Sequence, residues 1–93
     1  MRRPLFQSSA FVRATKRLLK RQPESDDALG VALERLAADA FDIRLKTHKL
    51  KGDLKGFLAF SIDNELRIIF KIVEHEGAEA VLLQTVGTHD QVY

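Results

Sequence analysis

Four side chains that transfer protons or bind phosphate stand at separated positions in this 93-residue sequence: His48, Arg67, His89 and Tyr93. Metal-free cleavage of RNA requires a base for the ribose 2′-hydroxyl, an acid for the leaving 5′-oxygen, and cations for the charge that develops on phosphorus. His48 or Tyr93 can act as the base, His89 as the acid and Arg67 as a phosphate ligand. We therefore treat these four residues as a candidate catalytic set.

Further polar residues surround these four positions. An arginine inside a strand, as Arg67 is between Leu66 and Ile68, is costly to bury unless it meets an anion or faces solvent. His75 lies beside acidic residues in a turn, and we assign it to the surface. The residues that we expect to contact RNA around the catalytic set are Lys49, Lys51, Lys55, Lys71, Ser61 and Thr85.

The charge of the chain favours an anionic partner. The net charge is +2, the pI is near 9.2, and the basic residues gather in segments 13–21 and 44–55. Such an excess attracts polyanions. The basic segment 13–21 is compatible with a solvated helix face, with contacts to ribosomal RNA, or with a groove for a protein partner.

Several functional classes are excluded by composition. Cysteine is absent, so disulfides, thiol catalysis and cysteine-bound zinc are excluded. The three histidines form no short-spaced metal motif, and we expect neither a metal nor another cofactor. No apolar run approaches the roughly 20 residues of a membrane span, and the start of the sequence lacks a signal-peptide pattern. We expect a cytoplasmic protein without membrane contact.

The hydrophobic pattern predicts one α+β domain over residues 1–93, because so short a chain has no material for a second core. Apolar residues at spacings of three and four predict a helical hairpin over 9–22 and 25–40. Ser8 or Ser9 is expected to cap the first helix and Ser25 the second. Alternation predicts strands near 57–62, 65–73 and 79–86, with a short strand at 3–7. The closing segment 87–93 is too short and polar for another full strand. The expected order is β-α-α-β-β-β, with the helices packed on a small antiparallel sheet.

Strand parity predicts which residues share a face. A tight turn at 63–65 pairs Phe60 with Ile68 and Ser61 with Arg67, and a slip by one residue would mix apolar and polar faces. One face then packs on the helices. The other exposes Ser61, Arg67 and Lys71, whereas alternation leaves the direction of Thr85 open.

Three motifs together resemble the RelE/YafQ/ParE superfamily of toxins from type II toxin-antitoxin systems. They are HKLKGDLKG at 48–56, DNELRIIF at 63–70 and GTHDQVY at 87–93. The resemblance implies a RelE-like microbial RNase fold and ribosome-dependent cleavage of messenger RNA that leaves a 2′,3′-cyclic phosphate. It also implies contacts with 16S ribosomal RNA and inhibition by a cognate antitoxin. Functional positions of YafQ-like members match His48, His89 and Tyr93, and those of RelE-like members match Arg67 and Tyr93.

The sequence departs from that pattern at two site positions. Ser61 stands where YafQ-like proteins place a second sheet histidine, and Thr85 stands where they place an arginine. Two alternatives to the nuclease follow from the resemblance. One is a ParE-like inhibitor of DNA gyrase without enzymatic activity. The other is a catalytically weakened toxin that only binds its antitoxin.

Overall fold

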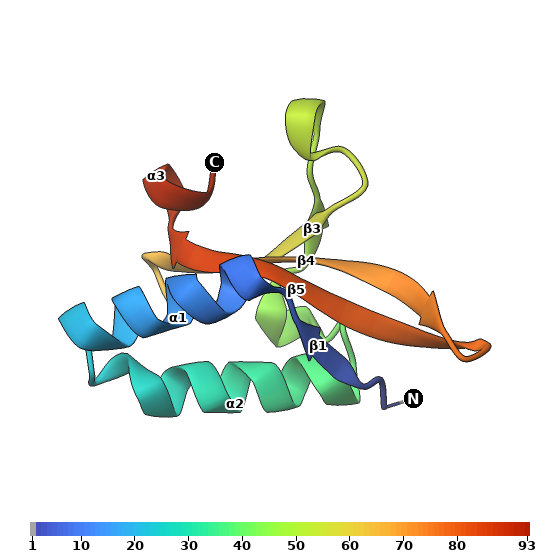
Figure 1. Ribbon diagram of the computed structural model, residues 1–93, viewed down its shortest axis with the longest axis horizontal. Helices are drawn as coiled ribbons and strands as arrows, with labels where there is room; N and C mark the ends of the chain where they lie inside the picture. Colours follow the sequence, from blue (N-terminus) through green and yellow to red (C-terminus); the bar gives the residue numbers. More distant parts are fainter. Residues whose placement is uncertain (1) are drawn as a thin grey trace.

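The computed structural model describes residues 2–93 as a five-stranded sheet with two long helices on one face and a single helical turn on the other (Figure 1). The predicted α+β class is confirmed. In chain order the elements are β1 Leu5–Gln7, α1 Ser9–Arg21, α2 Ser25–Ala38, the 3₁₀ turn η1 Ile43–Leu45, β2 His48–Lys49, the 3₁₀ turn η2 Gly52–Leu54, β3 Leu58–Ser61, β4 Leu66–His75, β5 Ala78–Thr88 and α3 His89–Val92.

The helical hairpin is confirmed, with one difference at the N-terminus of its second helix, α2. The Ser8 side chain accepts a hydrogen bond from the Phe11 N–H at 3.0 Å and so begins α1 as expected. Ser25 was expected to cap α2, but Glu24 holds that position and Ser25 is the first helical residue. The Ser25 hydroxyl instead lies 3.3 Å from Oε1 of Gln22, across the turn that joins the helices.

The sheet is mixed rather than antiparallel throughout. Its strand order is β1-β5-β4-β3-β2, and β2 to β5 pair antiparallel. β1 pairs parallel with β5, with Leu5 opposite Val81. The prediction of a purely antiparallel sheet was therefore wrong at this edge. β1 is not joined to its neighbour β5 by a tight turn, because α1, α2 and the other strands lie between them in the chain, so the two strands can run in the same direction. The two-residue strand β2 was too short for alternation to reveal.

The predicted strand register is confirmed in the centre of the sheet. Ser61 pairs with Arg67 and Phe60 with Ile68. The turn between them is fixed by Asp63, whose carboxylate accepts hydrogen bonds from the backbone N–H groups of Glu65 and Leu66 at 2.8 and 2.9 Å.

One hydrophobic core lies between the two long helices and the sheet face that carries Phe60, Ile68 and Phe70. The side chains of Phe60 and Phe70 are fully buried and meet edge to face, with ring centroids 5.8 Å apart. Burial of each large apolar side chain contributes about 1.5–3 kcal/mol. The helical side of the core consists of Phe11, Ala14, Leu18, Leu29, Ala32, Leu36 and Ala40.

The segment after the predicted third long strand is ordered. We expected that strand over 79–86, followed by a polar tail, but β5 continues to Thr88 and α3 follows directly. Figure 1 shows α3 on the face opposite α1 and α2. Residues 50–57, which include η2, rise above that same face (Figure 1). Within residues 2–93 no helix is both long and apolar enough to cross a membrane.

Candidate functional site

The strand register brings most of the predicted site residues to the sheet face opposite α1 and α2. Residues paired across antiparallel strands point to the same face. Two adjacent rows result. The first runs across four strands and contains His48, Ala59, Ile69 and Thr85. The second contains Ser61, Arg67 and Gly87. The register also answers the question that alternation left open, since it places Thr85 beside Ile69 in the His48 row.

Among residues 2–93, no carboxylate forms an ion pair with Arg67. Its Nη1 donates hydrogen bonds to the backbone carbonyls of Asp63 at 3.0 Å and Leu66 at 3.2 Å, which hold the half-buried side chain at the end of the sheet. A guanidinium has five N–H donors, so donors remain for an anionic ligand.

The helical turn α3 positions two further site residues. The Thr88 side chain accepts from the Gln91 N–H at 3.4 Å, and the Gln91 side chain accepts from the Thr88 N–H at 2.9 Å. This reciprocal capping box satisfies two backbone donors and starts the turn. The rings of His89 and Tyr93 then meet edge to face with centroids 4.4 Å apart.

Gly87 allows α3 to fold back onto the sheet. A Cβ atom at this position would lie 2.8 Å from Oε1 and 3.2 Å from Cβ of Gln91, and 3.3 Å from Cγ1 of Val92. Gln91 cannot move away freely because its Oε1 belongs to the capping box. Gly87 is also the cross-strand partner of Arg67. The missing side chain therefore makes room for α3 directly beside Arg67.

The phenol of Tyr93 is protonated at neutral pH and can donate a hydrogen bond. Partial burial raises the pKa of its phenol above the ordinary 10.0, while the positive charge of Arg67 acts in the opposite direction. A phenol with a raised pKa stays protonated, so Tyr93 suits hydrogen-bond donation better than the role of base.

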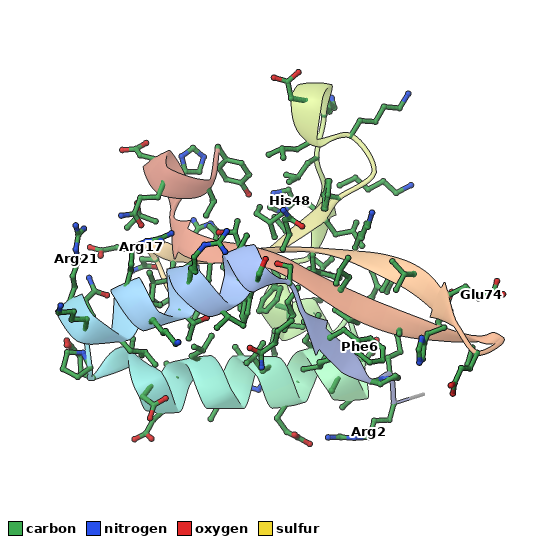
Figure 2. All side chains as sticks on the ribbon, in the orientation of Figure 1. Arg2, Phe6, Arg17, Arg21, His48 and Glu74 are labelled. Atoms are coloured by element: carbon green, nitrogen blue, oxygen red, sulfur yellow. The ribbon has the colours of Figure 1, made fainter. Side chains whose placement is uncertain are left out.

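His48, unlike Tyr93, offers a lone pair that can accept a proton. Its Nδ1 lies 3.1 Å from the backbone carbonyl oxygen of Lys46. A carbonyl oxygen only accepts hydrogen bonds, so in the neutral imidazole Nδ1 carries the proton and Nε2 keeps its lone pair. Figure 2 shows His48 on the side of the sheet away from α1 and α2. The exposed imidazole is thereby prepared to take up a proton at Nε2.

His89 is open to solvent and has an acidic neighbour. Its side chain is 67% exposed, and its Nδ1 lies 3.7 Å from Oδ1 of Asp90, which pairs with the imidazole when that is protonated. A protonated, exposed imidazole next to the Tyr93 phenol can donate a proton to a leaving group.

The predicted lysines are dispersed around this face. Lys71 lies on it, with its Nζ 5.3 Å from the centroid of the Phe57 ring. Lys51 and Lys55 flank η2 on the exposed arm above the sheet. Lys49 pairs with Leu58, whose side chain packs against the core, so the register directs Lys49 to the other face from His48. The structure thus gathers His89, Tyr93 and Arg67, with His48 in the neighbouring row, and does not bring Lys49 to them.

Two positioning residues were missed by sequence reasoning. Thr88 and Gln91 hold the turn that carries His89 and Tyr93. The spacing Thr-x-x-Gln is the signature of a capping box and was available as a signal. In the part of the chain that the structure describes, no group of three or more His, Asp or Glu side chains is arranged to hold a metal ion.

Comparison with known proteins identifies the family. The family model described as the bacterial toxin of a type II toxin-antitoxin system, YafQ, matches residues 3–93. The chain belongs to the YafQ family of toxins. The resemblance expected from the three sequence motifs is therefore confirmed. Among curated proteins, none matches the chain.

Solved structures show the same YafQ-like fold. YafQ from E. coli strain BL21(DE3) superimposes with a TM-score of 0.80 at 19% sequence identity, covering 98% of both chains. A metal-bound toxin from Helicobacter pylori gives a TM-score of 0.78 at 24% identity, with complete coverage of both chains. YafQ in the E. coli DinJ–YafQ toxin-antitoxin complex gives 0.78 at 18% identity, covering 100% of this chain and 99% of that one. At these identities the structures establish the fold alone.

Proposed function

We propose that this YafQ-family toxin is a metal-free endoribonuclease that cleaves messenger RNA on the ribosome in the bacterial cytoplasm. The observation that carries the proposal is α3, which sets the rings of His89 and Tyr93 against each other at 4.4 Å and packs over Gly87, the cross-strand partner of Arg67. Together with His48, these side chains supply a base, an acid and a phosphate ligand.

The proposed reaction breaks one phosphodiester bond. His48 Nε2 removes the proton from the ribose 2′-hydroxyl, and the 2′-oxygen attacks the adjacent phosphorus. Arg67 and the Tyr93 hydroxyl donate hydrogen bonds to the phosphoryl oxygens, where negative charge accumulates. Protonated His89 gives its proton to the leaving 5′-oxygen. The products are a 2′,3′-cyclic phosphate and a free 5′-hydroxyl, and the two imidazoles exchange their protonation states.

The surroundings of the site favour an RNA substrate. Lys51, Lys55 and Lys71 add positive charge around the face that holds Arg67. Ser61 and Thr85 add hydroxyls within the two cross-strand rows. Cations and hydroxyl donors of this kind contact the phosphates and sugars of RNA.

We further propose that a cognate antitoxin holds the toxin inactive. The support comes from the E. coli relative, whose structure was solved as a DinJ–YafQ toxin-antitoxin complex. Because an active nuclease would stop translation, the free toxin is expected to arrest growth and the antitoxin to restore it.

Growth arrest and cleavage together test this function. In cells that express the toxin without antitoxin, we expect His89→Ala and Arg67→Ala to relieve the arrest. With purified toxin and translating ribosomes, toeprinting should show cleavage in phase with codons, slowed by about 10²–10³-fold in either variant because an acid or a charge-stabilising donor is removed. His75→Ala is the matched control, since this histidine is the last residue of β4 rather than part of a turn, and its ring meets Phe6 away from the site.

Three outcomes would contradict the proposal. Unchanged toxicity in both folded variants would remove His89 and Arg67 from the mechanism. Inhibition of DNA supercoiling without cleavage would support the ParE-like alternative. Binding of the antitoxin by a wild-type protein that neither cleaves nor arrests growth would identify a weakened toxin.

A further inference from the structure

A cavity of about 270 Å³ lies between the C-terminal half of α1 and the junction of β5 with α3. It forms where β1 ends, because β1 accompanies β5 only as far as Leu83 and the Ser8 hydroxyl donates to the Gln84 carbonyl at 3.0 Å. Beyond this point the edge of β5 has no neighbouring strand among residues 2–93. The polar residues that line the cavity are Arg17, Arg21, Gln22, Thr85, Thr88 and Gln91.

The cavity combines positive charge with neutral hydrogen-bonding groups. None of its lining residues is acidic. α1 carries five cations and no acid in its sequence SAFVRATKRLLKR, and the ion pairs recorded for residues 2–93 include none of the five. Figure 2 shows Arg17 and Arg21 projecting from α1 toward the side on which α3 lies. Among residues 2–93, no ion pair therefore neutralises the positive charge at the cavity.

We propose that this cavity is a subsite for a phosphate of the RNA backbone, an inference that rests on the nuclease function proposed above. Two guanidinium groups with hydroxyl and amide groups beside them match the acceptor oxygens of a phosphodiester. Thr88 and Gln91 line the cavity and also form the cap of α3. A phosphate in the subsite thus lies on one side of α3 while His89 and Tyr93 occupy that same turn, so one RNA strand contacts both.

An acidic peptide fits this cavity less well than RNA. Protein interfaces have a core of apolar and aromatic residues. The apolar residues that line the cavity are Ala14, Leu18 and Val86, and all three are buried in the core. The exposed large apolar residues among residues 2–93 lie elsewhere: they are Phe6, Val31, Phe41, Ile43 and Tyr93. A second cavity, of about 290 Å³ beside α2, has the mixed character of a protein contact, because it contains Val31 together with Asp27 and Arg35.

Paired charge removals on one helix test the subsite. The cavity variant is R17Q/R21Q, and the control is R13Q/K20Q, which removes the same charge from α1 at residues that do not line the cavity. All four residues are exposed, so both variants are expected to fold, as circular dichroism would verify. The message probe is a fluorescent 2′-O-methyl hexanucleotide, which has no 2′-hydroxyl to attack. A second arm uses ribosomes without message, which offer the phosphates of ribosomal RNA instead.

We expect the cavity variant to bind at least one of the two probes about tenfold more weakly than wild type, and the control to weaken binding by less than about threefold. The slope of log affinity against log salt should fall by about 0.7 for each RNA phosphate that the variant no longer neutralises. The affected arm tells which RNA supplies the phosphate. Because the hexanucleotide cannot be cleaved, its binding is independent of whether the toxin is a nuclease.

Three results overturn the inference. Equal weakening in both variants means that α1 attracts RNA only through its overall charge. Unchanged binding of both probes with weakened binding of the antitoxin means that the cavity holds a peptide. Absence of wild-type binding to either probe at low salt means that the cavity is no RNA site, even if ribosome-dependent cleavage is observed.

Discussion

On the sheet face toward α1 and α2 the central strands present apolar side chains such as Phe60, Ile68 and Phe70, whereas on the opposite face the same strands carry Ser61, Arg67 and Lys71. The first face is stabilised by the packing and burial of apolar side chains. The second face also buries Ala59 and Ile69, but its site residues are positioned by specific hydrogen bonds to short segments: the Asp63 turn, the Lys46 carbonyl and the cap of α3.

The difference separates folding from function. A change on the helix-covered face removes packing from the one core of a small domain and threatens the whole fold. A change on the other face displaces a turn of four residues or removes one donor, and the core remains. Mutations on the two faces should therefore lower stability and activity in opposite proportions, which the following experiments test.

The largest effect on stability is expected at Phe60. Phe60→Ala leaves a cavity beside Phe70, and we expect a decrease of about 3–5 kcal/mol in the free energy of unfolding, measured by denaturant titration. Phe41→Ala is the matched control, because Phe41 is 56% exposed and its removal should change stability by less than about 0.5 kcal/mol. Equal decreases in the two variants would contradict the assignment of the core to this face.

A smaller decrease in stability with a large decrease in activity is expected at Gly87. Gly87→Ala forces a Cβ into Gln91 and Val92, which should cost about 1–3 kcal/mol and move His89 and Tyr93 away from Arg67. Cleavage should fall more than stability. The control is Gly30→Ala in α2, where nothing lies within 4 Å of the new Cβ and the helix should gain about 0.5–1 kcal/mol. Full activity in Gly87→Ala would show that α3 need not sit against β5.

Removal of one cap hydroxyl tests the same turn more gently. Thr88→Val should destabilise α3 by about 1 kcal/mol, with faster amide hydrogen exchange confined to residues 89–93 and reduced cleavage. Thr88→Ser keeps the hydroxyl and should restore both. If Val and Ser behave alike, the capping box is not what positions His89 and Tyr93.

The smallest effect is a shift in the titration of Tyr93, the single tyrosine of the chain. Ultraviolet absorbance of the phenolate should give a pKa above 10.0, and Arg67→Gln should raise it further because the cation that lowers it is gone. Arg44→Gln, a control remote from α3, should leave it unchanged. Since the raised pKa belongs to the folded state, stability is expected to fall as the pH rises above 10 through this pKa. An unshifted pKa in Arg67→Gln would place the two side chains apart.

The sequence predicted the helix-covered face and its register because Phe60, Ile68 and their neighbours alternate over many residues. It predicted the face on which Arg67 lies for the same reason, but Arg67, expected to be exposed, is half-buried. Thr85 was beyond such reasoning, because the register between β4 and β5 shifts between Ile69 and Phe70 and so breaks the alternation. The strand β2 and the turn α3 are too short for any period to develop, and the parallel pairing of β1 depends on the path of the chain through both helices.

The turn α3 also shapes how such a toxin loses its toxicity in evolution. His89 and Tyr93 lie within five consecutive residues, and no residue of α3 belongs to the buried core. Under the proposed nuclease function, nonsense or frameshift mutations confined to these codons are expected to abolish cleavage while leaving the rest of the domain folded. Spontaneous survivors of toxin expression should therefore include a cluster of such lesions among otherwise folded proteins, and deep sequencing of survivors would reveal it. On the proposed function, loss of these few codons would leave a folded protein that no longer cleaves RNA and that is expected to keep binding the proposed antitoxin.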